Sequence, residues 1–173
     1  MSGAKKPISN LDKLKGSNLK NFRNEKEQVK KNKNLLIKTS EDVIDKFKII
    51  GFDYYKNSGQ LSQFAYRHYI VIVLLNIEKH FKEVYGGVSE PNEDYVNFYK
   101  KRGTRSNNEV ELGDIGNINF LLPTRYADLY FNLMHTYYVN ECSNLSSYSI
   151  SQFFIYIVEF IETHKLVHFE VNL

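Results

Sequence analysis

Catalytic chemistry in this sequence would have to come from five histidines, one cysteine and scattered carboxylates. His164 and His168 lie four residues apart, a spacing that suits two zinc ligands on a helix, but the glutamate of an HExxH motif is absent. Cys142 lies in a polar stretch without a neighbouring histidine to activate it as a nucleophile. His68 and His80 fall on an expected helix, where ordinary structural roles explain them. We therefore expect no catalytic residue, no metal site and no cofactor.

Basic residues form the second group that could do chemistry, and they gather early in the chain. Residues 1–39 hold 11 Lys and Arg against 3 acids, a net charge of +8, whereas the remainder holds 12 basic and 17 acidic residues, a net charge of −5. Such a basic arm is attracted to nucleic-acid phosphates or to an acidic protein surface. Residues 100–105 could also meet phosphates, although the helix dipole equally favours basic residues at the end of a helix. The candidate nucleic-acid-binding residues are Lys5, Lys6, Lys13, Lys15, Lys20, Arg23, Lys30, Lys31, Lys33, Lys100, Lys101, Arg102 and Arg105.

Length and composition indicate one intracellular domain. A chain of 173 residues that is 42% hydrophobic and 14% aromatic can bury one sizeable core but is short for two. A single cysteine cannot form an internal disulfide, which favours a reducing compartment. The most apolar run, residues 69–75, is far shorter than the roughly 20 residues that cross a bilayer, and the first residues lack the apolar stretch of a signal peptide. We therefore expect no contact with a membrane.

Helical periodicity dominates the sequence after residue 38 and predicts a mainly α fold. We expect a disordered, flexible basic arm over residues 1–34 and a single helical domain over residues 35–173, made of about five helices and a short C-terminal β-strand. Gly51 and Gly86 are expected to end helices, residues 52–60 are expected to be a loop, and residues 104–119 are expected to be a surface loop. The expected helices cover residues 41–51 (capped by Thr39 or Ser40), 61–85, 93–102, 124–139 and about 150–163 (led by Ser149 or Ser151), and the strand covers residues 167–173.

An aromatic stripe on the expected helix 124–139 is a candidate partner-binding face. Such stripes usually belong to a core, but tyrosine also suits a partner groove because it places a hydroxyl at the wet edge of an apolar contact. Both interpretations stay open. The candidate partner-binding residues are Tyr126, Tyr130, Met134, Tyr137 and Tyr138.

Three segments of the sequence carry a family resemblance. Residues 77–86 read Ile-Glu-Lys-His-Phe-Lys-Glu-Val-Tyr-Gly, an acid-Pro pair at Glu90-Pro91 precedes Tyr95, and residues 156–161 read Tyr-Ile-Val-Glu-Phe-Ile. In this order and spacing they resemble the MRG domain, the helical module of chromatin-modifying complexes that is related to mortality factor on chromosome 4. The resemblance covers about residues 34–170.

The resemblance implies a nuclear, non-enzymatic adaptor. Such a protein would be a subunit of a histone acetylation or deacetylation complex that acts in transcription regulation, and its groove would capture short apolar peptides from other protein subunits. The chain has no segment like a chromodomain with an aromatic cage, so the resemblance implies partner docking rather than the reading of methyl-lysine. The basic arm would meet DNA, a nucleosome or an acidic protein face.

Two other classes of function remain as alternatives. The first is a nucleic-acid-binding module that uses the basic arm and the cluster from Lys100 to Arg105, whose binding should weaken steeply with salt. The second is an enzyme with an unrecognised site, which would need a deep polar pocket with clustered titratable groups.

Overall fold

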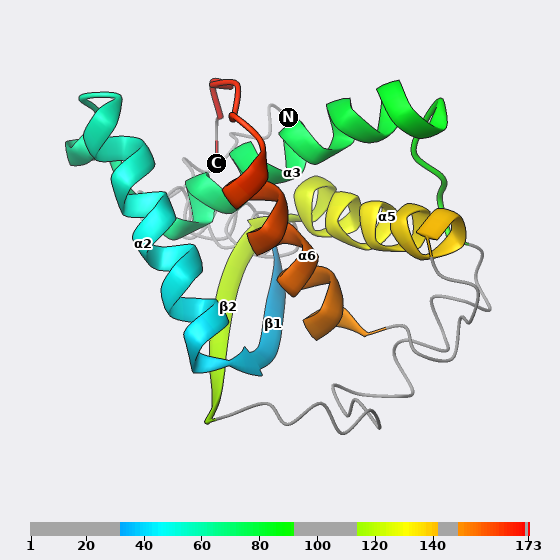
Figure 1. Cartoon of the computed structure of the whole chain (residues 1–173), viewed down its shortest axis with the longest axis horizontal. Helices are drawn as coiled ribbons and strands as arrows, with labels where there is room; N and C mark the ends of the chain where they lie inside the picture. The colour runs from blue at the N-terminus through cyan, green and yellow to red at the C-terminus, as the bar shows by residue number, and fades with distance from the viewer. Residues whose placement is uncertain (1–31, 92–113, 142–148, 172) are drawn as a thin grey trace, which may run out of the picture.

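The computed structural model describes residues 32–91, 114–141, 149–171 and 173 (Figure 1). Within these ranges the chain is mainly helical, with four α-helices, one short 3₁₀ helix and one antiparallel two-stranded sheet. The expected helix over residues 93–102 lies outside the described residues. The elements, in chain order, are β1 (Asn32–Ser40), α2 (Glu41–Asn57), η1 (Leu61–Gln63), α3 (Tyr66–Tyr85), β2 (Ile115–Pro123), α5 (Thr124–Glu141) and α6 (Ile150–Thr163).

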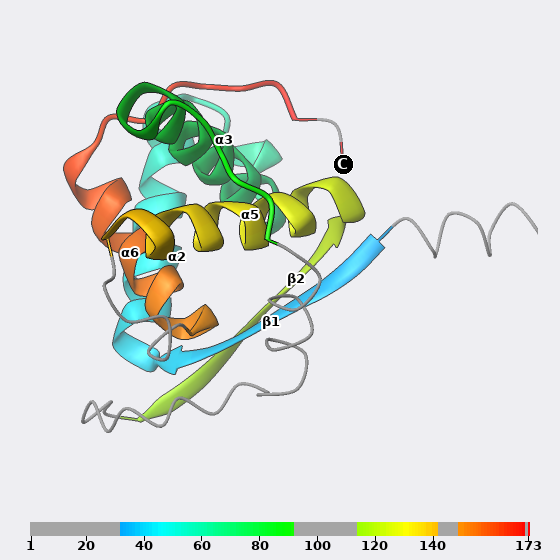
Figure 2. The ribbon, with the colours of Figure 1, turned by 90° about the vertical axis from the view of Figure 1, so that its right-hand side faces the viewer.

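The sheet forms one side of the molecule, and the helices cover one of its faces (Figure 2). β1 and β2 pair along their whole length, from Asn32 opposite Pro123 to Ser40 opposite Ile115. Because side chains alternate along a strand, every second residue faces the helices. The outward face includes Leu36 and Leu121, which are 40% and 54% exposed. The buried face carries Leu35, Ile37, Thr39, Ile118, Phe120 and Leu122.

The sequence did not predict this sheet. Residues 32–34 were expected in the flexible arm, and β2 was expected to be largely loop, but both segments are strands. Lys and Asn on the outward face interrupt the apolar pattern of β1 and β2, so the sequence of each strand by itself resembles that of a polar loop. Their pairing joins parts of the chain that lie far apart in sequence, which no local pattern reveals.

Helix α2 continues past Gly51, so the prediction that this glycine ends the helix is wrong. A Cβ atom at Gly51 would lie 2.7 Å from Cδ1 of Tyr69, which shows that the glycine lets α2 and α3 approach closely. At the other end, Ser40 occupies the expected cap position without a side-chain cap bond. The backbone N–H of Glu41 instead donates to the carbonyl oxygen of Asp114 at 2.9 Å, which joins the start of α2 to the residue before β2.

Helix α3 runs through the centre of the fold. The expected helix over residues 61–85 is divided, because η1 precedes α3 and the chain is extended at Ala65 between them. Residues 70–74 are buried on all sides, as their continuously apolar sequence predicts. Gly86 ends α3 with a left-handed φ of 78°, which confirms its expected role as a helix stop.

Helices α5 and α6 follow the sequence prediction closely. The side chain of Ser149 caps α6 by accepting a hydrogen bond from the N–H of Gln152 at 3.0 Å. Phe153 of α6 packs edge-on against Tyr130 of α5, with ring centroids 5.1 Å apart. None of the described helices is long and apolar enough to cross a bilayer.

The segment after α6, residues 165–171, lies across α3 and forms no strand (Figure 2). The expected C-terminal strand is therefore wrong for the described part of residues 167–173. The segment has the alternating sequence of a strand, but it lies on a helix, where no neighbouring strand offers a ladder of backbone hydrogen bonds. An asparagine side chain of α3 satisfies part of its backbone instead. We call residues 165–171 the post-α6 segment.

Candidate functional site: a polar pocket beside an exposed aromatic surface

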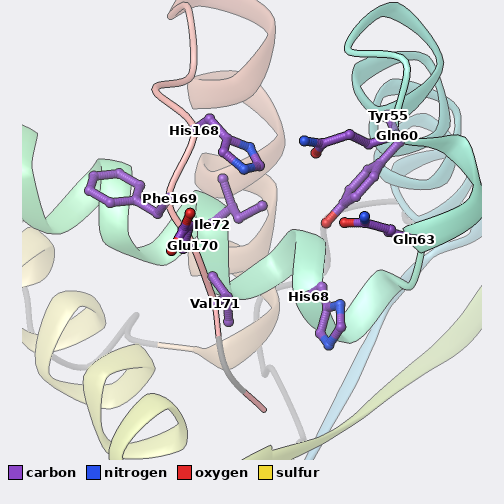
Figure 3. Close-up of a pocket in the computed structure, with 9 residues that line it drawn as sticks. All are labelled: Tyr55, Gln60, Gln63, His68, Ile72, His168, Phe169, Glu170 and Val171. Atoms are coloured by element: carbon purple, nitrogen blue, oxygen red, sulfur yellow. The ribbon is translucent and has the colours of Figure 1, made fainter.

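A pocket of about 380 Å³ lies between the end of α2, η1, α3 and the post-α6 segment (Figure 3). Two of its lining residues, Tyr55 and Ile72, are otherwise buried, at 3% and 2% exposure. The post-α6 segment supplies almost half of the lining residues, so the pocket exists in this form only while that segment stays on α3. The full lining is Tyr55, Gln60, Gln63, His68, Ile72, His168, Phe169, Glu170 and Val171.

Two histidines are among the polar residues that line the pocket. Figure 3 shows His68 and His168 at different sides of the pocket, with Ile72 between them. Nδ1 of His168 lies 3.1 Å from the hydroxyl of Tyr54, and the two rings stack with their centroids 6.5 Å apart. That contact commits one ring nitrogen of His168 to the protein itself. Among the described residues, no group of three or more His, Cys, Asp or Glu side chains is placed to hold a metal ion.

The electrostatics of the pocket favour a neutral His68. Partial burial lowers the pKa of His68, and the nearby positive charge of Arg67 lowers it further. The imidazole therefore stays uncharged near neutral pH, where it can both donate and accept a hydrogen bond. Together with the amides of Gln60 and Gln63, it offers donors and acceptors that suit the backbone or a polar side chain of a peptide.

An exposed group of aromatic and aliphatic side chains adjoins this pocket. Phe64 lies at its centre, edge-on to Phe52 at 5.9 Å and to Tyr66 at 4.8 Å between ring centroids. The Phe64 ring also contacts Tyr55 at 5.3 Å, so the aromatic contacts continue into the pocket wall. We call this surface the aromatic corner; it comprises Ile49 (62% exposed), Phe52 (42%), Leu61 (43%), Tyr66 (38%) and the half-buried Phe64.

The five candidate partner-binding residues do not form such a surface. Tyr130, Met134 and Tyr138 are at most 2% exposed, and Tyr126 and Tyr137 are half-buried. The hydroxyl of Tyr130 donates to the carbonyl oxygen of Ile150 at 2.9 Å, and that of Tyr138 donates to Oε1 of Gln152 at 3.0 Å. Tyr137 stacks on Tyr156 at 4.2 Å. This stripe therefore joins α5 to α6, which is the core interpretation of its spacing.

Lys33 is the candidate nucleic-acid-binding residue that lies within the described part of the chain. Its Nζ lies 2.6 Å from Oδ1 of Asp128 on α5, so this charge is engaged in an ion pair that links β1 to α5. The candidates in residues 1–31 and 100–105 lie outside the described residues, as does Cys142.

The sequence prediction missed the aromatic corner because residues 52–60 were expected to form a loop. The signal that marks the corner is the density of rings at Phe52, Tyr54, Tyr55, Phe64 and Tyr66 around a polar Asn-Ser-Gly stretch. Only the packing of α2 against η1 and the start of α3 brings these rings together.

No family model, curated protein or solved structure matches this chain. The geometry of its own residues therefore carries the functional proposal, and the resemblance to the MRG domain remains an expectation.

Proposed function

We propose that this chain is a non-enzymatic adaptor that binds a short apolar peptide of another protein. The peptide would lie on the aromatic corner and reach into the adjoining pocket. The observation that carries this proposal is the unbroken series of ring contacts from exposed Phe52 through Phe64 to Tyr55 in the pocket wall. Contiguous exposed apolar surface next to a few converging polar groups is typical of peptide-binding sites.

The chemistry of the two parts is complementary. The aromatic corner offers anchoring contacts, and burial of one large apolar side chain of a partner there would contribute about 1.5–3 kcal/mol. The pocket offers hydrogen-bond donors and acceptors at Gln60, Gln63 and His68, which would hold the partner in one orientation and satisfy its polar groups.

We further propose that the partner is a subunit of a chromatin-associated complex in the nucleus, of the histone acetylation or deacetylation type. The resemblance of residues 77–86 and 156–161 to the MRG domain supports this. The basic residues of the N-terminal part, with a net charge of +8 over residues 1–39, support a further contact with DNA or a nucleosome.

Partner capture by full-length chains would test the proposal. We expect the double variant Phe52→Asp with Leu61→Asp to lose the partner that wild type retains, because two buried charges would meet an apolar peptide. Mass spectrometry of native complexes, combined with photo-crosslinking from position 61, would identify the partner and place it on the corner.

Val84→Asp is the matched control, since Val84 is an exposed apolar residue of α3 outside the corner, at 56% exposure. Circular dichroism would confirm that each variant folds. Equal capture by wild type and the folded double variant would refute docking at the corner. A captured partner that belongs to no chromatin complex would refute only the proposed nuclear context.

A further inference from the structure

Asn76 is a polar residue in the most deeply buried part of α3. Its neighbours Leu74 and Ile77 are fully buried, and Asn76 itself is only 7% exposed. A buried amide is costly unless it is hydrogen-bonded, so its partners show why it is tolerated there.

The Asn76 amide binds both backbone groups of a single residue, Val167. Its Nδ2 donates to the Val167 carbonyl oxygen at 2.9 Å, and its Oδ1 accepts from the Val167 N–H at 2.8 Å. Nδ2 also donates to the carbonyl oxygen of Ile72 one turn earlier in α3, at 2.8 Å, which fixes the orientation of the amide. Two bonds to one residue reproduce what a neighbouring antiparallel strand would give it. Asn76 therefore recognises a backbone, whatever the side chain.

The residues around Val167 add side-chain selectivity. Leu166 and Val171 are partly buried against the core, whereas the Val167 side chain itself is 48% exposed. The next residue, His168, stacks on Tyr54 and bonds to its hydroxyl. The surface thus fits a short peptide with an apolar residue, then any residue, then a flat ring that can bond to a hydroxyl.

We infer that the surface of α3 around Asn76, with Tyr54 of α2, is a receptor for a peptide backbone that is occupied here by the chain's own post-α6 segment. A partner peptide with the same pattern would displace this segment. The inference rests on the proposed adaptor function for the source of that peptide, but it assigns a second site, distinct from the aromatic corner. Because His168, Phe169, Glu170 and Val171 line the pocket, their displacement would also open the pocket beside the corner.

The experiment uses the full chain and a fluorescent peptide of residues 165–171, measured by anisotropy. In wild type the internal segment competes with the peptide. The variant Val167→Pro removes the N–H that Asn76 accepts but leaves the receptor unchanged. We expect the peptide to bind this variant about tenfold more tightly than wild type, the factor that corresponds to loss of roughly one hydrogen bond by the competitor.

Val167→Thr is the matched control, because it keeps the backbone N–H and changes only a half-exposed side chain; it should bind the peptide as wild type does. A peptide that is N-methylated at the valine should bind Val167→Pro about tenfold more weakly than the unmodified peptide. Faster hydrogen exchange at the Val167 N–H of wild type on addition of the peptide would report release of the internal segment, because Asn76 accepts a hydrogen bond from that N–H.

Equal peptide binding by wild type and Val167→Pro, or no effect of N-methylation, would overturn the inference. Capture that still depends on Phe52 and Leu61 would then leave the adaptor proposal standing. Conversely, tighter peptide binding by Val167→Pro without any dependence of partner capture on Phe52 and Leu61 would refute the corner and leave this receptor in place.

Discussion

Two buried side chains of α3 that carry polar groups differ in how their hydrogen-bonding groups are satisfied. Asn76 bonds through both ends of its amide, whereas the hydroxyl of Tyr69 is buried without a hydrogen-bond partner among the described residues. Burial raises the pKa of Tyr69, and the nearby hydroxyls of Tyr54 and Tyr55 raise it further. The Tyr69 ring nevertheless packs well, with the Phe47 centroid 5.2 Å away. Tyr69 therefore serves the core through its ring and not through its hydroxyl.

This difference predicts opposite outcomes for two tyrosine-to-phenylalanine variants. Tyr69→Phe should leave the free energy of unfolding unchanged or raise it by about 1 kcal/mol, because it removes a buried unpaired hydroxyl. Tyr130→Phe should lower it by about 1 kcal/mol, because it breaks the hydrogen bond to Ile150. Urea unfolding measures both values. A larger loss for Tyr69→Phe than for Tyr130→Phe would show that the Tyr69 hydroxyl has a partner.

At the scale of elements, the fold depends on close contacts between helices and on the two faces of the sheet. Phe120 of β2 contacts Phe47 of α2 at 5.8 Å and Phe154 of α6 at 6.4 Å between ring centroids. One strand residue therefore connects the sheet to two helices. The next residue, Leu121, points to the outward face and is 54% exposed.

Alanine substitutions in β2 should follow this alternation. Phe120→Ala should lower the free energy of unfolding by about 3–5 kcal/mol, since it leaves a cavity beside the rings of Phe47 and Phe154. Leu121→Ala should change it by about 0.5 kcal/mol or less, as expected for an exposed site. Thermal and urea unfolding of the two variants would check the difference. Similar losses at the two positions would contradict the assigned faces of the sheet.

The close approach of α2 and α3 at Gly51 leads to a second prediction about how the elements pack. Gly51→Ala should destabilise the fold by about 1–3 kcal/mol, although alanine favours helices, because the new methyl group would overlap the Tyr69 ring. Gly87→Ala is the control, since a Cβ there would meet no atom within 4 Å. Urea unfolding of both variants gives the comparison. A gain in stability for Gly51→Ala would mean that helix propensity outweighs the contact.

For the whole molecule, two histidines link stability to pH. Burial lowers the pKa of His68 in the pocket and of His135 on α5, and in His68 the charge of Arg67 adds to this effect. The unfolded chain, with histidine pKa values near 6.5, then binds more protons than the folded chain just below that pH. The resulting stabilisation is complete above the unfolded pKa and is lost as the pH falls toward the folded pKa.

We therefore expect the double variant His68→Asn with His135→Asn to lose less stability than wild type between about pH 7.5 and pH 5.5. Urea midpoints at the two pH values measure how much stability each protein loses. The carboxylates are common to both proteins, so the difference between the two losses reports these histidines. A steeper loss in the variant would show that the folded protein favours the charged histidines.

Sequence alone was sufficient for the helices that local chemistry specifies. The apolar run of α3, the serine that caps α6 and the glycine that ends α3 each act within a few residues of themselves, so their roles are legible in one segment. The uneven charge between residues 1–39 and the rest is also a property of the sequence alone.

Tertiary structure decided the rest, because it depends on which distant surfaces meet. β1 and β2 are strands because they pair with each other, and Gly51 serves a close approach of α2 to Tyr69 rather than the end of a helix. The alternating residues after α6 lie against a helix rather than a strand, and the side chain of Asn76 accepts a hydrogen bond from the backbone of Val167. The aromatic corner arises in the same way, since η1 brings Phe64 against Phe52. Periodicity shows that a face is apolar, but only the packed chain determines whether that face is covered.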